Sequence, residues 1–345
     1  MVLVLGNNEI RDLLTWAEVI NVCEKLLWEE ANGTAWFSPR QRLVTTNQGI
    51  LTILPGGAAG VNIMGTRLYS QQPNAIAAKR FIHELSSNSV NVVWDMTSAE
   101  LLVITAGEWI NTLRTTAQAA VGAKYLARKD SRRLGILGSG MLALGSLMTL
   151  KEVFPLELAK VYSRTSDHRN SFCKKFSPLA GFPVTPVNSS RDAVEDVDIL
   201  VTATTSTEPV FDGQWLQKGT HVSCIGGYTQ AGGRELDAAA MAKFDVLAVL
   251  NKEHTMKGGV GTDRANANFT AAVDRGVIRW EDVAEIADIM AERTPGRRDA
   301  DEITLFDSRA MGAFDIALSY RAYQLAKERD LGYLVDWGNR PDPGW

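Results

Sequence analysis

RLGILGSGMLA, residues 133–143, is the stretch of sequence that decides the fold. Residues 134–137 form an apolar run typical of a buried strand, and a helix-like stretch begins at Met141. The Gly-x-Gly-x-x-Ala turn between them is made by Gly138, Gly140 and Ala143. Gly138 permits the tight turn, Gly140 lets the backbone approach a pyrophosphate, and Ala143 allows the helix to pack closely on the strand. This order predicts a dinucleotide site at a helix N-terminus.

Around this turn, short apolar runs alternate with helix-length stretches. The predicted strands cover residues 134–137, 159–163, 184–187, 198–203, 220–225 and 245–250. The predicted helices cover residues 141–153, 167–176, 190–197 and 235–243. This alternation indicates βαβ units, a parallel sheet and right-handed crossovers. These six strands are enough for a Rossmann domain, so the predicted fold class is α/β.

The first part of the chain has a different pattern, in which one long helix precedes a series of strands. The helix covers residues 9–31, and the strands cover 42–46, 49–55, 62–69, 91–95 and 101–105. An amphipathic helix over residues 308–328 follows the Rossmann segment. We therefore predict an α+β substrate and dimerisation domain from residues 1–113 and 306–345, and a dinucleotide-binding domain from residues 114–305.

Composition excludes several kinds of partner. The net charge of −4 and the pI near 5.7 give no reason to expect nucleic acid or an anionic membrane surface. No apolar run reaches the roughly 18 residues that span a bilayer. Cys23, Cys173 and Cys224 are far apart, and His221 lies on a predicted buried strand, so no metal site or disulfide is expected. The N-terminus lacks signal-peptide features, which favours a cytoplasmic location.

The end of the second predicted strand discriminates between nicotinamide cofactors. NAD-binding proteins usually place an acidic residue there to hold the ribose 2′-hydroxyl. Here the sequence is Ser163-Arg164-Thr165, in which Arg164 can form a fork to a 2′-phosphate with two hydroxyls beside it. The alternative is a solvated arginine after a strand. NADP(H) is therefore favoured, and NAD(H) remains possible.

The chain resembles the ornithine cyclodeaminase/mu-crystallin family over nearly its whole length. The matching motifs are NTLRTTA (111–117), AKYLAR (123–128), the glycine turn, VTAT (201–204), EPV (208–210), GTHV (219–222), RELD (234–237) and DEITLF (301–306). The resemblance implies a homodimer that exchanges a hydride between a nicotinamide and the α-carbon of an amino or imino acid. It also implies a small carboxylate substrate.

Together, the glycine turn and the resemblance give a set of expected cofactor-binding residues. They are Thr115, Gly138, Ser139, Gly140, Met141, Leu142, Ser163, Arg164, Thr165, Thr202, Ala203, Thr204, Ile225 and Gly226.

Two positions depart from the family pattern. Where members usually carry a lysine, this chain has Arg67, which binds a carboxylate well but is a poor proton donor. Where cyclodeaminases carry an aspartate, it has Tyr228, whose phenol cannot replace a carboxylate as base near neutrality without a large pKa shift. Cyclodeamination is thereby disfavoured. Whether Arg67 and Tyr228 take part in the chemistry or only line the pocket is left open.

Three further residues match family positions near the substrate. Arg42 aligns with the arginine that binds the substrate carboxylate, although Arg40 is an alternative two residues away. Arg114 aligns with the arginine before the Rossmann domain. Asp315 aligns with an acidic residue near the active site, and the alternative is an ordinary aspartate on a helix face. The candidate substrate-binding residues are Arg42, Arg67 and Arg114, and the candidate catalytic residues are Arg67, Tyr228 and Asp315.

These residues favour an NAD(P)H-dependent reductase of a small imino acid or ketimine carboxylate, or the reverse oxidation of an amino acid. Two alternatives remain open. One is an ornithine-type cyclodeaminase or an alanine-type dehydrogenase. The other is a non-enzymatic NADPH and small-ligand binder, as the resemblance to the crystallin permits.

Overall fold

The computed structural model describes residues 1–71, 89–227, 233–257, 266–309 and 311–338. The chain divides into two compact units. The first unit contains Met1–Arg114 and Met311–Trp345, and the second contains Thr115–Ala310. The chain crosses from the first unit to the second within helix α5 (Glu108–Leu126), between Arg114 and Thr115.

The second unit is built on a parallel sheet with the strand order β10-β9-β8-β11-β12-β15-β13-β14. The strands are β8 (Arg133–Leu137), β9 (Leu158–Tyr162), β10 (Val184–Pro186), β11 (Ile199–Thr202), β12 (His221–Cys224), β13 (Val246–Val249), β14 (Ala284–Glu285) and β15 (Thr304–Asp307). Every residue of β11, β12, β13 and β15 is buried, as expected for strands covered on both faces.

Helices connect these strands. They are α6 (Met141–Val153), α7 (Ser166–Ala180), α8 (Ser190–Val194), α9 (Ala238–Lys243), α10 (Lys252–Lys257), α11 (Ala267–Asp274) and α12 (Ile286–Met290). The α/β prediction is confirmed. The six predicted strands correspond to β8 through β13, and β14 and β15 were not predicted. The predicted boundary at 305/306 would divide β15, which lies whole within the second unit.

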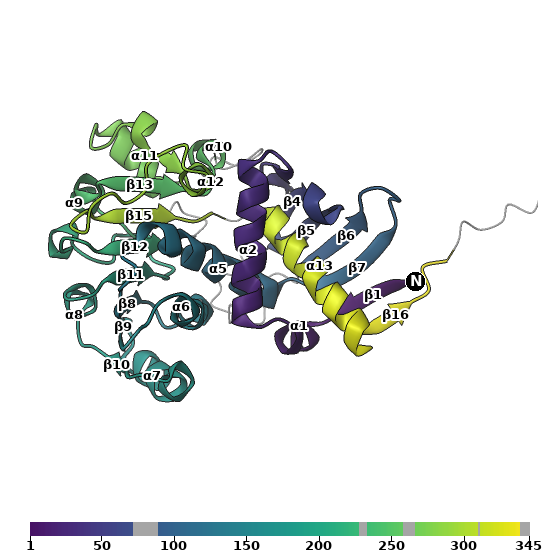
Figure 1. The fold of residues 1–345 in the computed structure, drawn as a ribbon, viewed down its shortest axis with the longest axis horizontal. Coiled ribbons are helices and arrows are strands. Elements are labelled where there is room, and N and C mark those ends of the chain that lie inside the picture. The colour runs from purple at the N-terminus through teal and green to yellow at the C-terminus, as the bar shows by residue number, and fades with distance from the viewer. Residues whose placement is uncertain (72–88, 228–232, 258–265, 310, 339–345) are drawn as a thin grey trace, which may run out of the picture. The chain divides into compact units, whose positions relative to one another are not determined.

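The first unit has a mixed sheet with the order β16-β1-β7-β6-β5-β4-β2, and β3 also pairs with β4. The strands are β1 (Val2–Leu5), β2 (Ala35–Phe37), β3 (Gln41–Val44), β4 (Ile50–Ala58), β5 (Ile63–Gln71), β6 (Val90–Asp95), β7 (Leu101–Ala106) and β16 (Tyr333–Val335). Its helices are α1 (Asn7–Leu13), α2 (Trp16–Ala31) and α13 (Gly312–Arg329). Figure 1 shows α13, in yellow, packed beside α2 over this sheet.

Two helix predictions need correction. The helix expected over residues 9–31 is two helices, because Thr15 caps α2 in a reciprocal capping box with Glu18. The C-terminal helix begins at Gly312 rather than at residue 308.

Two glycines fix where α13 starts on the sheet. A Cβ at Gly312 would lie 2.0 Å from the Leu54 carbonyl oxygen, and one at Gly56 would lie 2.6 Å from the Ala313 nitrogen. The first turn of α13 therefore packs directly on β4. This close approach brings Asp315, in that first turn, onto the inner face of the sheet.

Candidate active site

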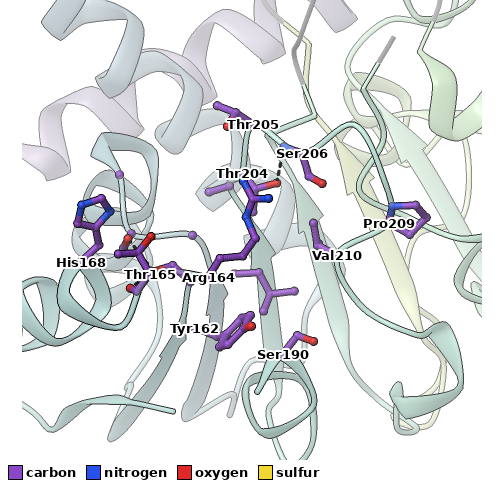
Figure 2. Close-up of a pocket in the computed structure, with 16 residues that line it drawn as sticks. Tyr162, Arg164, Thr165, His168, Ser190, Thr204, Thr205, Ser206, Pro209 and Val210 are labelled. Atoms are coloured by element: carbon purple, nitrogen blue, oxygen red, sulfur yellow. Dashed lines mark hydrogen bonds between the residues drawn. The ribbon is translucent and has the colours of Figure 1, made fainter. Parts of the chain in front are cut away.

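A cavity of about 470 Å³ opens in the second unit at the ends of β8, β9 and β11. Its walls are Leu137, Gly138, Ser139, Gly140, Tyr162, Ser163, Arg164, Thr165, His168, Ser190, Ala203, Thr204, Thr205, Ser206, Pro209 and Val210. Figure 2 shows that these side chains come from several separate turns of the chain. Ligands of open parallel sheets bind outside the carboxyl ends of the strands, where this cavity lies.

The glycine turn has the conformation that a pyrophosphate site needs. Gly138 has a φ of +125°, and a Cβ there would lie 2.5 Å from the Ala203 carbonyl oxygen. Gly140 is the N-cap of α6, and a Cβ there would meet nothing within 4 Å. The open space at Gly140 therefore borders the unpaired N–H groups of a 13-residue helix, which fits a bound dinucleotide phosphate.

The end of β9 supplies polar groups to the same cavity. Ser139 donates a hydrogen bond to Ser163 at 3.1 Å between their hydroxyl oxygens. Arg164 lines the cavity with an exposed side chain, and Figure 2 shows it directed into the space below Thr204 and Ser206. His168, in the first turn of α7, also lines the cavity; the sequence analysis did not single it out.

A buried carboxylate, Glu235, holds Thr204 of the cavity wall in place. Glu235 accepts hydrogen bonds from the Thr202 hydroxyl at 2.7 Å, the Thr204 amide at 2.7 Å and the Thr204 hydroxyl at 2.6 Å. It also accepts one from the Gly226 amide at 3.0 Å. Burial raises the pKa of Glu235, and the bonds from Thr204 and Thr202 offset part of that rise. Glu235 thus ties the end of β11 to the segment after β12.

The predicted cofactor residues divide into two groups. Eight of them line the cavity: Gly138, Ser139, Gly140, Ser163, Arg164, Thr165, Ala203 and Thr204. The other six are not among its lining residues. Met141, Leu142 and Thr202 are next to lining residues in the sequence, whereas Thr115 lies on α5 and Ile225 and Gly226 follow β12.

The first unit carries a second cluster of functional side chains. Arg67 on β5 donates to the Asp315 carboxylate at 2.9 Å and to the Asn111 side-chain oxygen at 2.6 Å. Arg114 on α5 donates to the same Asn111 oxygen at 2.5 Å, and its Nε lies 3.6 Å from the second Asp315 oxygen. Asp315 is fully buried, so it aligns two buried guanidinium groups.

Two more arginines act on Tyr69, one from β3 and one from the segment before it. Arg42 is opposite Thr52, which is in turn opposite Tyr69, so the three side chains share one row across β3, β4 and β5. Arg40, just before β3, is 4% exposed. We call Arg40, Arg42, Arg67 and Arg114 the arginine cluster. The structure thus gathers all three predicted substrate arginines and the alternative Arg40 in one unit.

The pKa of Tyr69 reflects this surrounding charge. Burial acts to raise the pKa of the phenol, but the Arg40 and Arg67 guanidinium groups, with a contribution from Arg42, lower it below its ordinary value. The Arg67 guanidinium carbon lies 5.2 Å from the centroid of the Tyr69 ring. Tyr69 was not among the residues predicted from the sequence.

The remaining predictions concern Tyr228, His221, metal sites and membrane spans. Tyr228 lies outside the described residues. His221 is a core residue, bonded to Thr304 at 2.8 Å and Ser223 at 3.0 Å, and burial lowers its pKa to about 3. Among the residues that the structure describes, no cluster of His, Cys, Asp or Glu is arranged to hold a metal. None of the helices within the described ranges is long and apolar enough to cross a membrane.

A Rossmann unit with a dinucleotide cavity, joined to a unit with an arginine cluster, defines a nicotinamide-dependent oxidoreductase. The sequence model of the ornithine cyclodeaminase/mu-crystallin family matches residues 2–330. The chain belongs to this family. The resemblance on the sequence motifs is thereby confirmed.

Solved and curated relatives agree with this assignment. The Thermococcus litoralis Δ1-pyrroline-2-carboxylate reductase in complex with NADH and L-proline is 30% identical, with a TM-score of 0.86, covering 97% of this chain and 100% of that one. An archaeal alanine dehydrogenase dimer with bound NAD is 26% identical, with a TM-score of 0.84, covering 98% and 99%. The Bacillus cereus Δ1-pyrroline-2-carboxylate reductase is 28% identical over 337 residues, covering 97% of this chain and 100% of the relative.

The protein is therefore an NAD(P)-dependent oxidoreductase that acts on carbon–nitrogen bonds.

Proposed function

We propose that this protein reduces a small imino acid carboxylate, of the Δ1-pyrroline-2-carboxylate kind, with NADPH. One observation carries the proposal: four arginines, from β3, the segment before it, β5 and α5, surround Tyr69, and three of them are no more than 7% exposed. Buried guanidinium groups at this density suit an anionic ligand, since bidentate bonds to a carboxylate are among the strongest that a side chain makes. The reductases among the relatives support the choice of substrate.

In this proposal, some residues bind the substrate and others position the binding residues. Arg42, Arg67 and Arg114 hold the substrate carboxylate, with Arg40 beside them. Asp315 and Asn111 act as positioning residues, because each binds both Arg67 and Arg114 and so fixes the angle between the two guanidinium groups. The cofactor, when bound, supplies the hydride that the imine carbon accepts. Catalysis then depends on orientation and on stabilising charge rather than on a strong base.

NADPH is proposed as the preferred cofactor. The cavity wall at the end of β9 carries Ser163, Arg164 and Thr165, and among the described residues none that lines the cavity is acidic. A 2′-phosphate between these groups forms charge-assisted bonds, whereas a carboxylate that would favour NADH is missing from the lining. The two named solved relatives hold NADH or NAD, so this preference is a property proposed for this chain's own residues.

Arg164→Ala tests the cofactor preference. We expect the Kd for NADPH to rise about 10- to 100-fold, because a hydrogen bond to a charged group contributes about 1.5–3 kcal/mol. The Kd for NADH should stay within about twofold of the original value, since NADH has no 2′-phosphate. Fluorescence titration measures both constants. The control is Arg293→Ala, which removes an exposed arginine of the second unit outside the cavity. Equal weakening of both cofactors would contradict the assignment of Arg164.

Steady-state assays decide between the proposed function and its rivals. The purified protein is assayed with NADPH and a panel of cyclic imino acids, and with 2-oxo acids plus ammonia. The proposal predicts the highest kcat/KM for a cyclic carboxylated imine. Ammonia release from ornithine with catalytic NAD⁺ would establish a cyclodeaminase instead. Tight cofactor binding without turnover of any substrate would establish a binding protein of the crystallin kind.

A homodimer is proposed from exposed apolar side chains on the first unit's sheet. Leu43 and Leu51 are paired across β3 and β4 and are 59% and 37% exposed, and Met64 on β5 and Val90 on β6 are also exposed. Exposed apolar side chains on four neighbouring strands of one sheet suit an interaction surface. The archaeal relative described as a dimer supports the same assembly.

The buried, unpaired cysteines support a reducing, cytosolic location.

Leu51→Asp tests this interface. The wild-type protein should sediment at twice the 37.7 kDa chain mass. The variant should dissociate at least about 100-fold more readily, because the interface would bury an unpaired carboxylate. Leu179→Asp, at an exposed leucine of α7 in the second unit, is the matched control and should remain dimeric. A wild-type monomer, or a dimeric Leu51→Asp variant, would rule this face out.

A further inference from the structure

Reduction of an imine needs a proton as well as a hydride, and the residue that supplies it is the open question of the site. Arg67 occupies the position where family members usually have a lysine. A guanidinium stays protonated under ordinary conditions and is a poor proton donor. Arg67 is also committed to Asp315 at 2.9 Å and Asn111 at 2.6 Å. The proton therefore has to come from a different side chain or from water.

Tyr69 is placed for this role. It lies two residues after Arg67 on β5, so both side chains point to the same face of the sheet. The Arg67 guanidinium carbon is 5.2 Å from the Tyr69 ring centroid. Tyr69 is 8% exposed, so it is a buried residue beside the arginine cluster rather than a surface tyrosine.

Charged groups face Tyr69 from several elements. Arg40 and Arg42 act on it from the segment before β3 and from β3 itself, and Arg67 acts from its own strand. Arg114 on α5 also interacts with Tyr69, and Asp315 on α13 interacts with Arg114. Thr52 on β4, opposite Tyr69, is uncharged. Among these neighbours the positive charges outnumber the negative one, so the surroundings stabilise a phenolate.

We propose that Tyr69 is the proton donor to the imine nitrogen in the reductive reaction. The hydride forms the new C–H bond at the imine carbon, and the π electron pair of the C=N bond moves to nitrogen. The Oη–H bond of Tyr69 breaks as the new N–H bond forms, leaving a phenolate beside Arg40 and Arg67. The phenolate recovers its proton from solvent after the amino acid leaves. This inference rests on the proposed function.

The direction of the pH dependence follows from this role. Tyr69 must be a protonated phenol to donate, so the reductive rate falls as pH rises through its pKa. Amino acid oxidation needs the phenolate, so that rate rises with pH through the same pKa. Because the surrounding arginines lower the pKa of Tyr69, both changes should fall below the ordinary tyrosine value of about 10.

Tyr69→Phe is the direct test, with Tyr333→Phe as its control at an exposed tyrosine on β16. Reductive kcat should fall at least about 100-fold in the first variant, as for the loss of a general acid, with KM little changed. The control should keep the original kcat. Ultraviolet difference titration, without substrate, should show one early-ionising tyrosine that Tyr69→Phe removes and Tyr333→Phe retains.

A second variant keeps the tyrosine and changes its surroundings. Arg40→Gln removes the strongest positive influence on Tyr69, so both the phenol titration and the fall in reductive rate should move to higher pH. A purely structural role for Tyr69 predicts no such coupled shift.

The outcomes separate this inference from the function on which it rests. If the wild-type protein reduces an imino acid and Tyr69→Phe keeps its kcat and pH profile, the proton assignment is wrong and the function stands. If the early-ionising tyrosine persists in Tyr69→Phe, the assignment is also wrong. If the wild-type protein reduces no imino acid, both the proposed function and the assignment of Tyr69 as proton donor are wrong.

Discussion

Asp315→Ala should destabilise the first unit by about 3–5 kcal/mol, because removing one partner of a buried ion pair leaves uncompensated charge in the interior. Asp315 lies 2.9 Å from Arg67 and 3.6 Å from Arg114, and its side chain is fully buried. Without it, two guanidinium groups that are 8% and 5% exposed face each other with no carboxylate between them. Denaturant unfolding of the purified variant measures the change.

An exposed ion pair in the same unit provides the control. Arg11 and Asp12 are 3.8 Å apart, with side chains 58% and 71% exposed. Asp12→Ala should change the free energy of unfolding by no more than about 1 kcal/mol, since solvent screens such pairs. If Asp315→Ala were as mild as Asp12→Ala, Asp315 would not be the residue that holds the two arginines in place.

Gly140→Ala should abolish cofactor binding without harming the fold. The added methyl group meets no atom of the protein within 4 Å, and Gly140 has an ordinary φ of −95°. In the proposed complex the pyrophosphate occupies that open space, so the methyl group keeps it off the helix N-terminus. We expect the Kd for NADPH to rise about 100-fold or more, equivalent to about 2.7 kcal/mol. Titration calorimetry and thermal unfolding measure the two properties separately.

Gly181→Ala should show the opposite pattern. Gly181 is also surrounded by open space, but it closes α7 with a φ of +83°. Alanine there should cost about 1 kcal/mol of stability and leave NADPH binding unchanged. Normal NADPH binding by Gly140→Ala would place the pyrophosphate away from the glycine turn.

The sequence predicted the parts of the fold whose signal is local. The strand, glycine turn and helix around Gly138 follow one another directly over residues 133–153, so their order is visible in the sequence. By contrast, β15 was not predicted, and its place between β12 and β13, far from it in the sequence, is visible only in the fold. The break at Thr15 was also missed, because apolar spacing continues through it and only the capping box shows where α2 begins.

The candidate site shows the same division. The arginines were identified through the family resemblance, but the bond from Arg67 to Asp315 joins residues 248 positions apart. Tyr69 was not singled out, because its importance comes from strand register, which places Thr52 and Arg42 in its row. In the sequence Glu235 is only part of the RELD motif. The fold shows that it accepts hydrogen bonds from Thr202 on β11 and from the Gly226 amide.

The most direct test of the central claim follows the hydride. The protein is supplied with Δ1-pyrroline-2-carboxylate and NADPH carrying deuterium at nicotinamide C4, prepared separately with the label on each face. Mass spectrometry and NMR of the product then locate the label. We predict one deuterium on the α-carbon of proline with one labelled face and none with the other. NADPH oxidation that leaves both proline samples unlabelled, or no proline at all, would contradict the account.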